Sequence, residues 1–209
     1  MTRASASSPR SRWLAPASTA VWLAAAALSG PFGIWPAIGG AAVALGAAVL
    51  LFDRALAKEL LRPGSRLLLA GAAAGGLLAA LTYLIYPLLA RLLPFVAVDT
   101  ARLYRAFRAP APLVASVAIV PVIVGEELVW RGVVQASLTR RLGALRGVTA
   151  AAALYALVHA PLGSPVLVAV AFLCGLLWGT LCATTASLVP TLVAHLLWDV
   201  LVLLWSPLT

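Results

Sequence analysis

Long apolar runs, separated by short polar segments, follow one another along almost the whole chain. Most have about 20 residues, the length with which an α-helix crosses a hydrocarbon core roughly 30 Å thick. A membrane β-barrel would instead show alternating segments of about ten residues. We therefore predict an all-α, polytopic transmembrane bundle of about seven helices, within a range of six to eight. The predicted spans are residues 13–29, 33–52, 67–90, 113–137, 147–161, 165–183 and 187–206.

Three segments differ from the rest. Residues 1–12 are rich in Ser, Ala and Arg, which predicts a disordered, basic N-terminal tail. The first span resembles a signal peptide in its basic flank, but the spans that follow favour an uncleaved helix. Residues 103–108 alternate aromatic and basic side chains, which predicts an amphipathic helix on the membrane surface. We expect residues 13–209 to form a single integral membrane domain.

The composition agrees with this pattern, since 63% of the residues are hydrophobic and only 10% are charged. The net charge of +9 could indicate a nucleic-acid-binding protein, but the basic residues flank the apolar spans, where they determine topology. We therefore expect a lipid bilayer and no nucleic acid as partner. With a cytoplasmic N-terminus, residues 91–108 carry the basic side chains of the opposite face. The cytoplasmic ones are Arg3, Arg10, Arg12, Arg54, Lys58, Arg62, Arg66, Arg140, Arg141 and Arg146.

A small set of ionisable side chains falls inside the predicted spans, all in the second half of the chain. A charged side chain at mid-bilayer costs roughly 2.5–3.5 kcal/mol on insertion scales, so four cost on the order of 10 kcal/mol before they pair. A cost of this size indicates a buried functional site. The set is Glu126, Glu127, Arg131, His159, His195 and Asp199.

The spacing places these side chains on particular helix faces. Glu127 and Arg131 are four residues apart, so they share a face and can form an ion pair. Glu126 points about 100° away and lacks that partner. A carboxylate without a close cation in a dry site suits a general base.

Two further pairs have the same spacing on later spans. Tyr155 and His159 are one pair, and His195 and Asp199 are the other, in which the carboxylate can hold the imidazole in one tautomer. If these groups and Glu126 face one cavity, they can bind and deprotonate a water and stabilise an oxyanion. That is the chemistry of peptide-bond hydrolysis.

Four motifs occur in a fixed order on these spans. Together they resemble those of the CPBP family, the CAAX protease and bacteriocin-processing (Abi) intramembrane endopeptidases, whose best-known branch is the type II CAAX prenyl protease. The resemblance covers about residues 113–207, which it marks as the catalytic core. The motifs are Glu-Glu-x-x-x-Arg at 126–131, aromatic-x-x-x-His at 155–159, Phe-x-x-Gly-x-x-x-Gly at 172–179 and His-x-x-x-Asp at 195–199.

The resemblance implies a role for each group. Glu126 would be the general base, and His159 would help to hold the attacking water. His195 and the residue at position 199 would stabilise the oxyanion. Glu127 and Arg131 would organise the site or the substrate.

Two positions depart from the family pattern. Tyr155 stands where Phe is usual, and Asp199 stands where Asn is frequent. An ionised Asp cannot donate to an oxyanion, so Asp199 would orient His195 or join a metal site. The resemblance favours a glutamate mechanism without a cofactor, but a divalent metal such as zinc stays open. Its ligands would be Glu126, His159, His195 and Asp199.

We therefore predict an intramembrane endopeptidase that cuts near the membrane face, with a protein or peptide as substrate. The Ala- and Arg-rich composition suggests a GC-rich bacterium and its inner membrane. In such a membrane, the resemblance, which includes a myxosortase-like branch of the family, implies a processing role. The substrate would be a C-terminal tail or peptide of an exported or membrane-anchored protein. One alternative is a non-catalytic immunity or scaffold protein. Another is a proton-coupled transporter, although no internal repeat is present and the first half holds no charge predicted to be buried.

Overall fold

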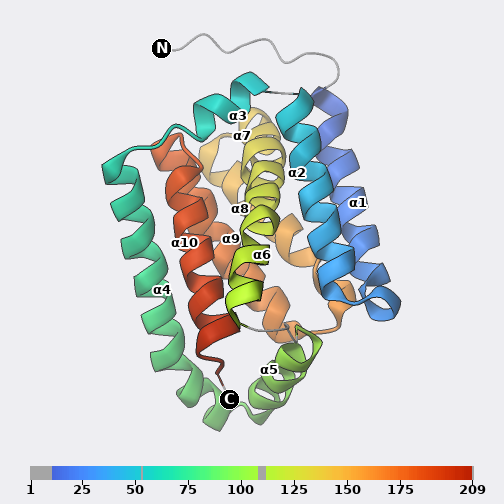
Figure 1. Ribbon diagram of the computed structural model, residues 1–209, viewed down its shortest axis with the longest axis vertical. Coiled ribbons are helices and arrows are strands. Elements are labelled where there is room, and N and C mark those ends of the chain that lie inside the picture. Colours follow the sequence, from blue (N-terminus) through green and yellow to red (C-terminus); the bar gives the residue numbers. More distant parts are fainter. Residues whose placement is uncertain (1–10, 53, 108–111, 209) are drawn as a thin grey trace.

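The computed structural model describes residues 11–52, 54–107 and 112–208, and every regular element within these ranges is helical (Figure 1). Within these ranges a short π-helical segment precedes α2, two others continue α6 and α10, and one 3₁₀ turn follows α8. The elements are α1 (Ser11–Phe32), η1 (Trp35–Gly39), α2 (Gly40–Phe52), α3 (Arg54–Leu60), α4 (Ser65–Leu92), α5 (Pro94–Ala106), α6 (Pro112–Glu127), η2 (Leu128–Gln135), α7 (Ala136–Leu142), α8 (Ala144–Leu157), η3 (Ala160–Leu162), α9 (Pro165–Thr185), α10 (Val189–Asp199) and η4 (Val200–Trp205).

The long helices form one bundle with two different ends (Figure 1). The short helices α3 and α7 lie at the end drawn uppermost, which we call the α3 end. The helix α5 lies across the other end, which we call the α5 end. Helices α4, α8 and α10 run from the α3 end towards the α5 end, and α6 and α9 run in the opposite direction.

The predicted all-α, polytopic membrane bundle is confirmed. Among the described residues, five helices are long and apolar enough to cross a membrane, and each overlaps a predicted span. A sixth apolar helix, Val189–Trp205, is shorter, and α6 continues through η2 into α7. The five are Trp13–Phe32, Trp35–Phe52, Ser65–Leu92, Ala144–Leu162 and Pro165–Thr185.

The segments between the spans differ from the predictions in detail. The predicted surface helix at 103–108 is the end of the longer helix α5, and Arg108 lies outside the described residues. Residues 1–10 of the predicted tail also lie outside them, while Ser11 and Arg12 already belong to α1. Helix α3 was not predicted, because its seven residues carry too many charges for a span and too few turns for a clear period.

Close helix contacts at glycines fix the positions of the helices that carry the polar side chains. A Cβ at Gly71 would come within 2.5 Å of the Pro190 carbonyl oxygen, and a Cβ at Gly75 within 2.7 Å of that of Ala194. Helix α4 therefore lies directly against α10 along its glycine face. Gly125 of α6 meets the backbone of Ala42 in α2 in the same way. Small residues allow such approaches between membrane helices.

We predict that Gly75→Ala destabilises the protein, because the new methyl group would meet backbone atoms of α10 that cannot rotate away. Overpacking of this kind costs about 1–3 kcal/mol. The matched control is Gly76→Ala on the next residue, where a Cβ would meet only Leu197 at 4.0 Å. That change should be neutral or slightly stabilising, since Ala favours helices over Gly. Thermal unfolding in detergent measures both, and equal midpoints would contradict the close contact.

Candidate active site

Glu126 lies at the end of α6 with its carboxylate buried inside the bundle. Its exposed fraction is 7%. The hydroxyl group of Tyr155, on α8, donates a hydrogen bond to Glu126 Oε1. Residue spacing alone could not predict this contact, because the two residues lie on different helices. Tyr155 therefore contributes its hydroxyl to the site as well as packing against it.

Glu127 lies deeper and accepts hydrogen bonds from two buried partners. Its Oε1 is 3.1 Å from Arg131 Nη1, which confirms the predicted ion pair, and 2.8 Å from His195 Nδ1. The exposed fractions of the three residues are 0%, 3% and 3%. An ionised carboxylate only accepts hydrogen bonds, so Nδ1 of His195 carries a proton. Glu127 thereby joins α6 to α10.

Aromatic rings surround the two cationic groups of this cluster. The Trp178 ring stacks on the His195 imidazole, with ring centroids 3.8 Å apart and planes at 19°. The guanidinium carbon of Arg131 lies 4.7 Å from the centre of the Tyr155 ring and 5.5 Å from that of Trp178. These contacts fix the plane of the imidazole and stabilise the guanidinium group where no water reaches it.

Asp199 lies on the other side of the imidazole. Its Oδ2 is 3.6 Å from His195 Nε2, which is too long for a hydrogen bond. The expectation that Asp199 holds the tautomer of His195 is therefore corrected, because Glu127 makes that hydrogen bond. Residue spacing predicts contacts within one helix. The hydrogen-bond partner of His195, however, is Glu127 on a different helix.

His159 lies where α8 ends. Its Nδ1 is 2.6 Å from the carbonyl oxygen of Tyr155, and its ring meets the Tyr155 ring edge-on with centroids 4.8 Å apart. A carbonyl oxygen only accepts, so Nδ1 donates and Nε2 of the neutral ring is left as an acceptor. His159 is 7% exposed.

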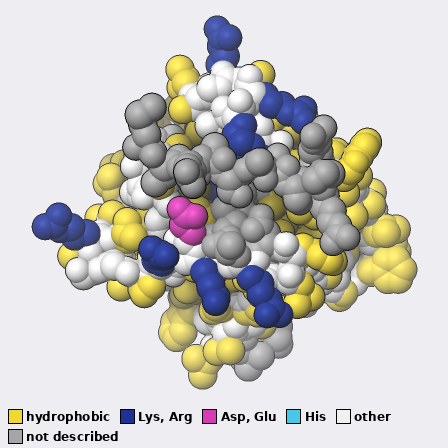
Figure 2. All heavy atoms as spheres, turned by 90° about the horizontal axis from the view of Figure 1, so that it is seen from above, with side chains coloured by type: hydrophobic (Ala, Val, Ile, Leu, Met, Phe, Trp, Pro, Cys, Tyr) yellow, Lys and Arg dark blue, Asp and Glu magenta, His cyan; other side chains and the backbone are white. Residues whose placement is uncertain are grey.

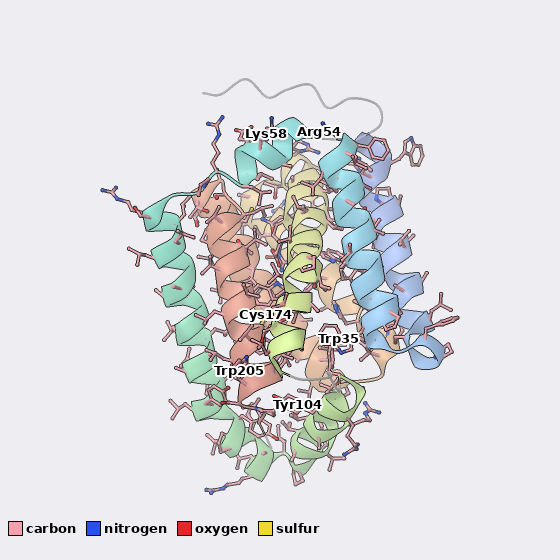
Figure 3. The ribbon with its side chains drawn as sticks, in the orientation of Figure 1. Trp35, Arg54, Lys58, Tyr104, Cys174 and Trp205 are labelled. Atoms are coloured by element: carbon pink, nitrogen blue, oxygen red, sulfur yellow. The ribbon has the colours of Figure 1, made fainter. Side chains whose placement is uncertain are left out.

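One cavity of about 420 Å³ brings the predicted side chains of α6, α8 and α10 together. Glu127 and Arg131 do not line this cavity and support it from behind. Most of the remaining wall is apolar, and it includes Cys174, which Figure 3 places among the central helices. The predicted residues that line the cavity are Glu126, Tyr155, His159, His195 and Asp199.

The same side chains are the predicted alternative ligands of a divalent metal. Among the described residues, no three His, Cys, Asp or Glu side chains come close enough to hold a metal ion. The four ligands of the metal alternative all line the cavity but do not form such a group.

Asp99 of α5 is a buried carboxylate that the sequence reasoning missed. It accepts hydrogen bonds from Ser164 Oγ at 2.5 Å, from the Val166 N–H at 3.1 Å and from Arg102 Nη2 at 2.7 Å. Arg102 also donates to the Gly163 carbonyl oxygen. The expectation that the first half holds no buried charge is thus wrong. The available signal was the i, i+3 pair of Asp99 and Arg102.

These contacts tie α5 to the turn between α8 and α9, directly after His159. Burial alone would raise the pKa of Asp99, but the hydrogen bonds from Ser164 and Val166 and the charge of Arg102 outweigh it and hold the pKa below its ordinary value. The Asp99 contacts are thus strongest when the carboxyl group is ionised.

With this geometry in place, the chain can be compared with known families. Residues 108–201 match the family model described as type II CAAX prenyl endopeptidase Rce1-like. Residues 108–201 are thus similar to the CAAX protease (CPBP) family. The matched segment runs from just before α6 to η4 and includes every predicted site residue. Searches of curated proteins and of solved structures found no match.

We predict that Glu127→Ala lowers the free energy of unfolding by about 3–5 kcal/mol, because it leaves Arg131 buried without a counter-charge. Arg131→Ala should be costly for the same reason. The double variant should cost less than the sum of the two, since neither charge then lies unpaired. Unfolding in detergent measures all three, and additive losses would contradict the coupling.

We predict that Asp99 makes stability depend on pH in the acid range. Its pKa is lower in the folded protein than in the unfolded chain, so its contribution is complete above about pH 5 and is lost as the pH falls through and below about 4. Asp99→Asn should lower stability at pH 7 and flatten this acid dependence. The control is Glu59→Gln, which changes an exposed carboxylate of α3. Thermal unfolding at several pH values measures this dependence. If stability falls with acid as steeply in Asp99→Asn as in wild type, the prediction is refuted.

Proposed function

We propose that this protein is a member of the CAAX protease family and a glutamate-type intramembrane endopeptidase, in which Glu126 and His159 activate a water that attacks a peptide bond. The observation that carries the proposal is the shared cavity, which Glu126, His159 and His195 reach from three different helices. The match of residues 108–201 to a family of endopeptidases supports the class of reaction.

The hydrogen bonds that Glu126 and His159 already make leave each side chain with an atom that can hold a water. Tyr155 binds Oε1 of Glu126, which leaves Oε2 to accept a proton. His159 donates from Nδ1 to the Tyr155 carbonyl, which leaves Nε2 as an acceptor for the same water. As the water oxygen attacks the carbonyl carbon, its proton passes to Glu126.

His195 serves the other side of the reacting carbonyl. Its Nδ1–H bond to Glu127 fixes the ring, and stacking on Trp178 fixes its plane, so Nε2 has a defined direction. When Nε2 also carries a proton, it can donate to the oxyanion, and Glu127 and Asp199 balance the charge of the imidazolium. The C–N bond then breaks, Glu126 returns its proton to the leaving amine, and a carboxylic acid and an amine are formed.

The wall of the cavity indicates the character of the substrate. Apolar side chains, among them Leu, Ile and Val of α4, α6 and α9, make up most of it, so the segment that enters is apolar. We propose that the substrate is a C-terminal tail or peptide of an exported or membrane-anchored protein, processed in a bacterial inner membrane. A myxosortase-like role would fit this substrate.

We predict that Glu126→Gln lowers cleavage by at least about 10²-fold, because the amide cannot take the proton of the water, while the fold is retained. Protein termini are mapped in cells that carry wild type or the variant, and a set of proteins should keep its tails only with the variant. Glu59→Gln is the control and should process like wild type. Unaltered termini in the Glu126→Gln cells, with the variant present and folded, would refute the glutamate mechanism.

A further inference from the structure

The cavity extends from the buried polar groups towards one end of the bundle only. On α4 its wall comes from residues 78–89, the half nearer the α5 end, and on α9 from residues 166–178, which again lie nearer that end. Helix α5 contributes Leu103 and Tyr104, and the loop beyond η4 contributes Leu208. Figure 3 shows Tyr104 and Trp35 on this side of Cys174.

Polar contacts and bulky side chains close the other direction. Gln135 Nε2 donates to the Gly179 carbonyl oxygen at 2.9 Å, and Thr191 Oγ1 donates to that of Trp178 at 3.2 Å. Beyond them, the Leu188 N–H donates to the Leu60 carbonyl oxygen at 2.9 Å. Trp178 and Gln135 are almost completely buried. A substrate therefore cannot reach the site from the α3 end without unpacking the bundle.

The rim of the cavity carries the side chains that favour a membrane–water interface. Trp35 donates its indole N–H to the Phe107 carbonyl oxygen at 3.2 Å, and the Tyr104 hydroxyl donates to that of Val202 at 2.6 Å. Tyr86 also belongs to the wall. Trp and Tyr are enriched at the level of the lipid headgroups, so the rim lies at the membrane face of the α5 end.

The two ends differ in their basic residues. Figure 2 looks onto the α3 end and shows Lys and Arg side chains spread around it. Arg54 and Lys58, labelled in Figure 3, lie there, and Arg140, Arg141 and Arg146 belong to the α7–α8 connection at the same end. The described basic residues of the α5 end are Arg91, Arg102 and Arg105, of which Arg102 is bound to Asp99. Basic loops stay in the cytoplasm, so the α3 end is cytoplasmic.

From these two asymmetries we propose that the cavity opens on the membrane face opposite the cytoplasm, and that the substrate is the apolar segment of a protein already exported. The direction of the cavity does not depend on catalysis. Only the second part of the inference, that a peptide bond is cut on that face, rests on the proposed function.

The test of orientation uses a matched pair of cysteine variants. Ala106→Cys lies at the end of α5 and Ala144→Cys at the start of α8, both exposed and neither changing a charge. Wild type is the blank, because Cys174 and Cys182 are buried. In intact cells, a membrane-impermeant maleimide should label Ala106→Cys and not Ala144→Cys, and detergent lysis should make both react. Labelling of Ala144→Cys in intact cells, or of Ala106→Cys only after lysis, would overturn the proposal.

A second measurement separates failure of this inference from failure of the proposed function. In the comparison of termini with Glu126→Gln, every affected protein should be exported, with its cut site on the face away from the cytoplasm. Affected proteins cut on the cytoplasmic face would overturn the inference while leaving the protease in place. If the cysteine labelling supports the proposed orientation but no protein terminus changes, the orientation stands and the protease assignment is rejected.

Discussion

The buried carboxylate of Glu127 is the constraint on which the site depends. It lies where no water can solvate it, and it is stabilised by Arg131 at 3.1 Å and by His195 at 2.8 Å. An unpaired charge at this depth would cost several kcal/mol, so both partners must stay in place. One comes from η2, which continues the helix of Glu127, and the other from α10. The pairing therefore fixes how these helices meet, and with it the imidazole that faces the cavity.

The chain's own pattern revealed much of this, but only within single helices. Apolar runs of sufficient length predicted the spans, because the bilayer imposes one length and one secondary structure on each. The spacing of Glu127 and Arg131 predicted their ion pair for the same local reason. The hydrogen bonds from Tyr155 to Glu126 and from His195 to Glu127 join separate helices, and no spacing encodes them. The sequence pattern likewise does not predict the π-helical turns of η1, η2 and η4.

Asp99 shows how a partial pattern led to a wrong inference. The sequence pattern predicts no buried charge in the first half, because Asp99 lies outside the predicted spans, in a surface helix. Its burial removes one argument against a proton-coupled transporter. It does not supply a relay, however, because Asp99 is absent from the cavity wall and is engaged by Arg102, Ser164 and Val166. Its contacts join α5 to the turn after His159, which is a structural use.

The two halves of the chain contribute different parts of the cavity. Residues 108–201 match the family and carry the polar groups, but they do not complete the cavity alone. Helix α4 packs its glycine face on α10 and adds Leu and Ile side chains to the wall, and α5 closes the rim. Trp22 of helix α1 packs against Trp130, with ring centroids 5.8 Å apart. Under the proposed function, the chemistry uses a fixed set of polar groups and the substrate touches mainly the apolar wall, so changes in α4 and α5 would alter which peptide is accepted without disturbing how it is cut.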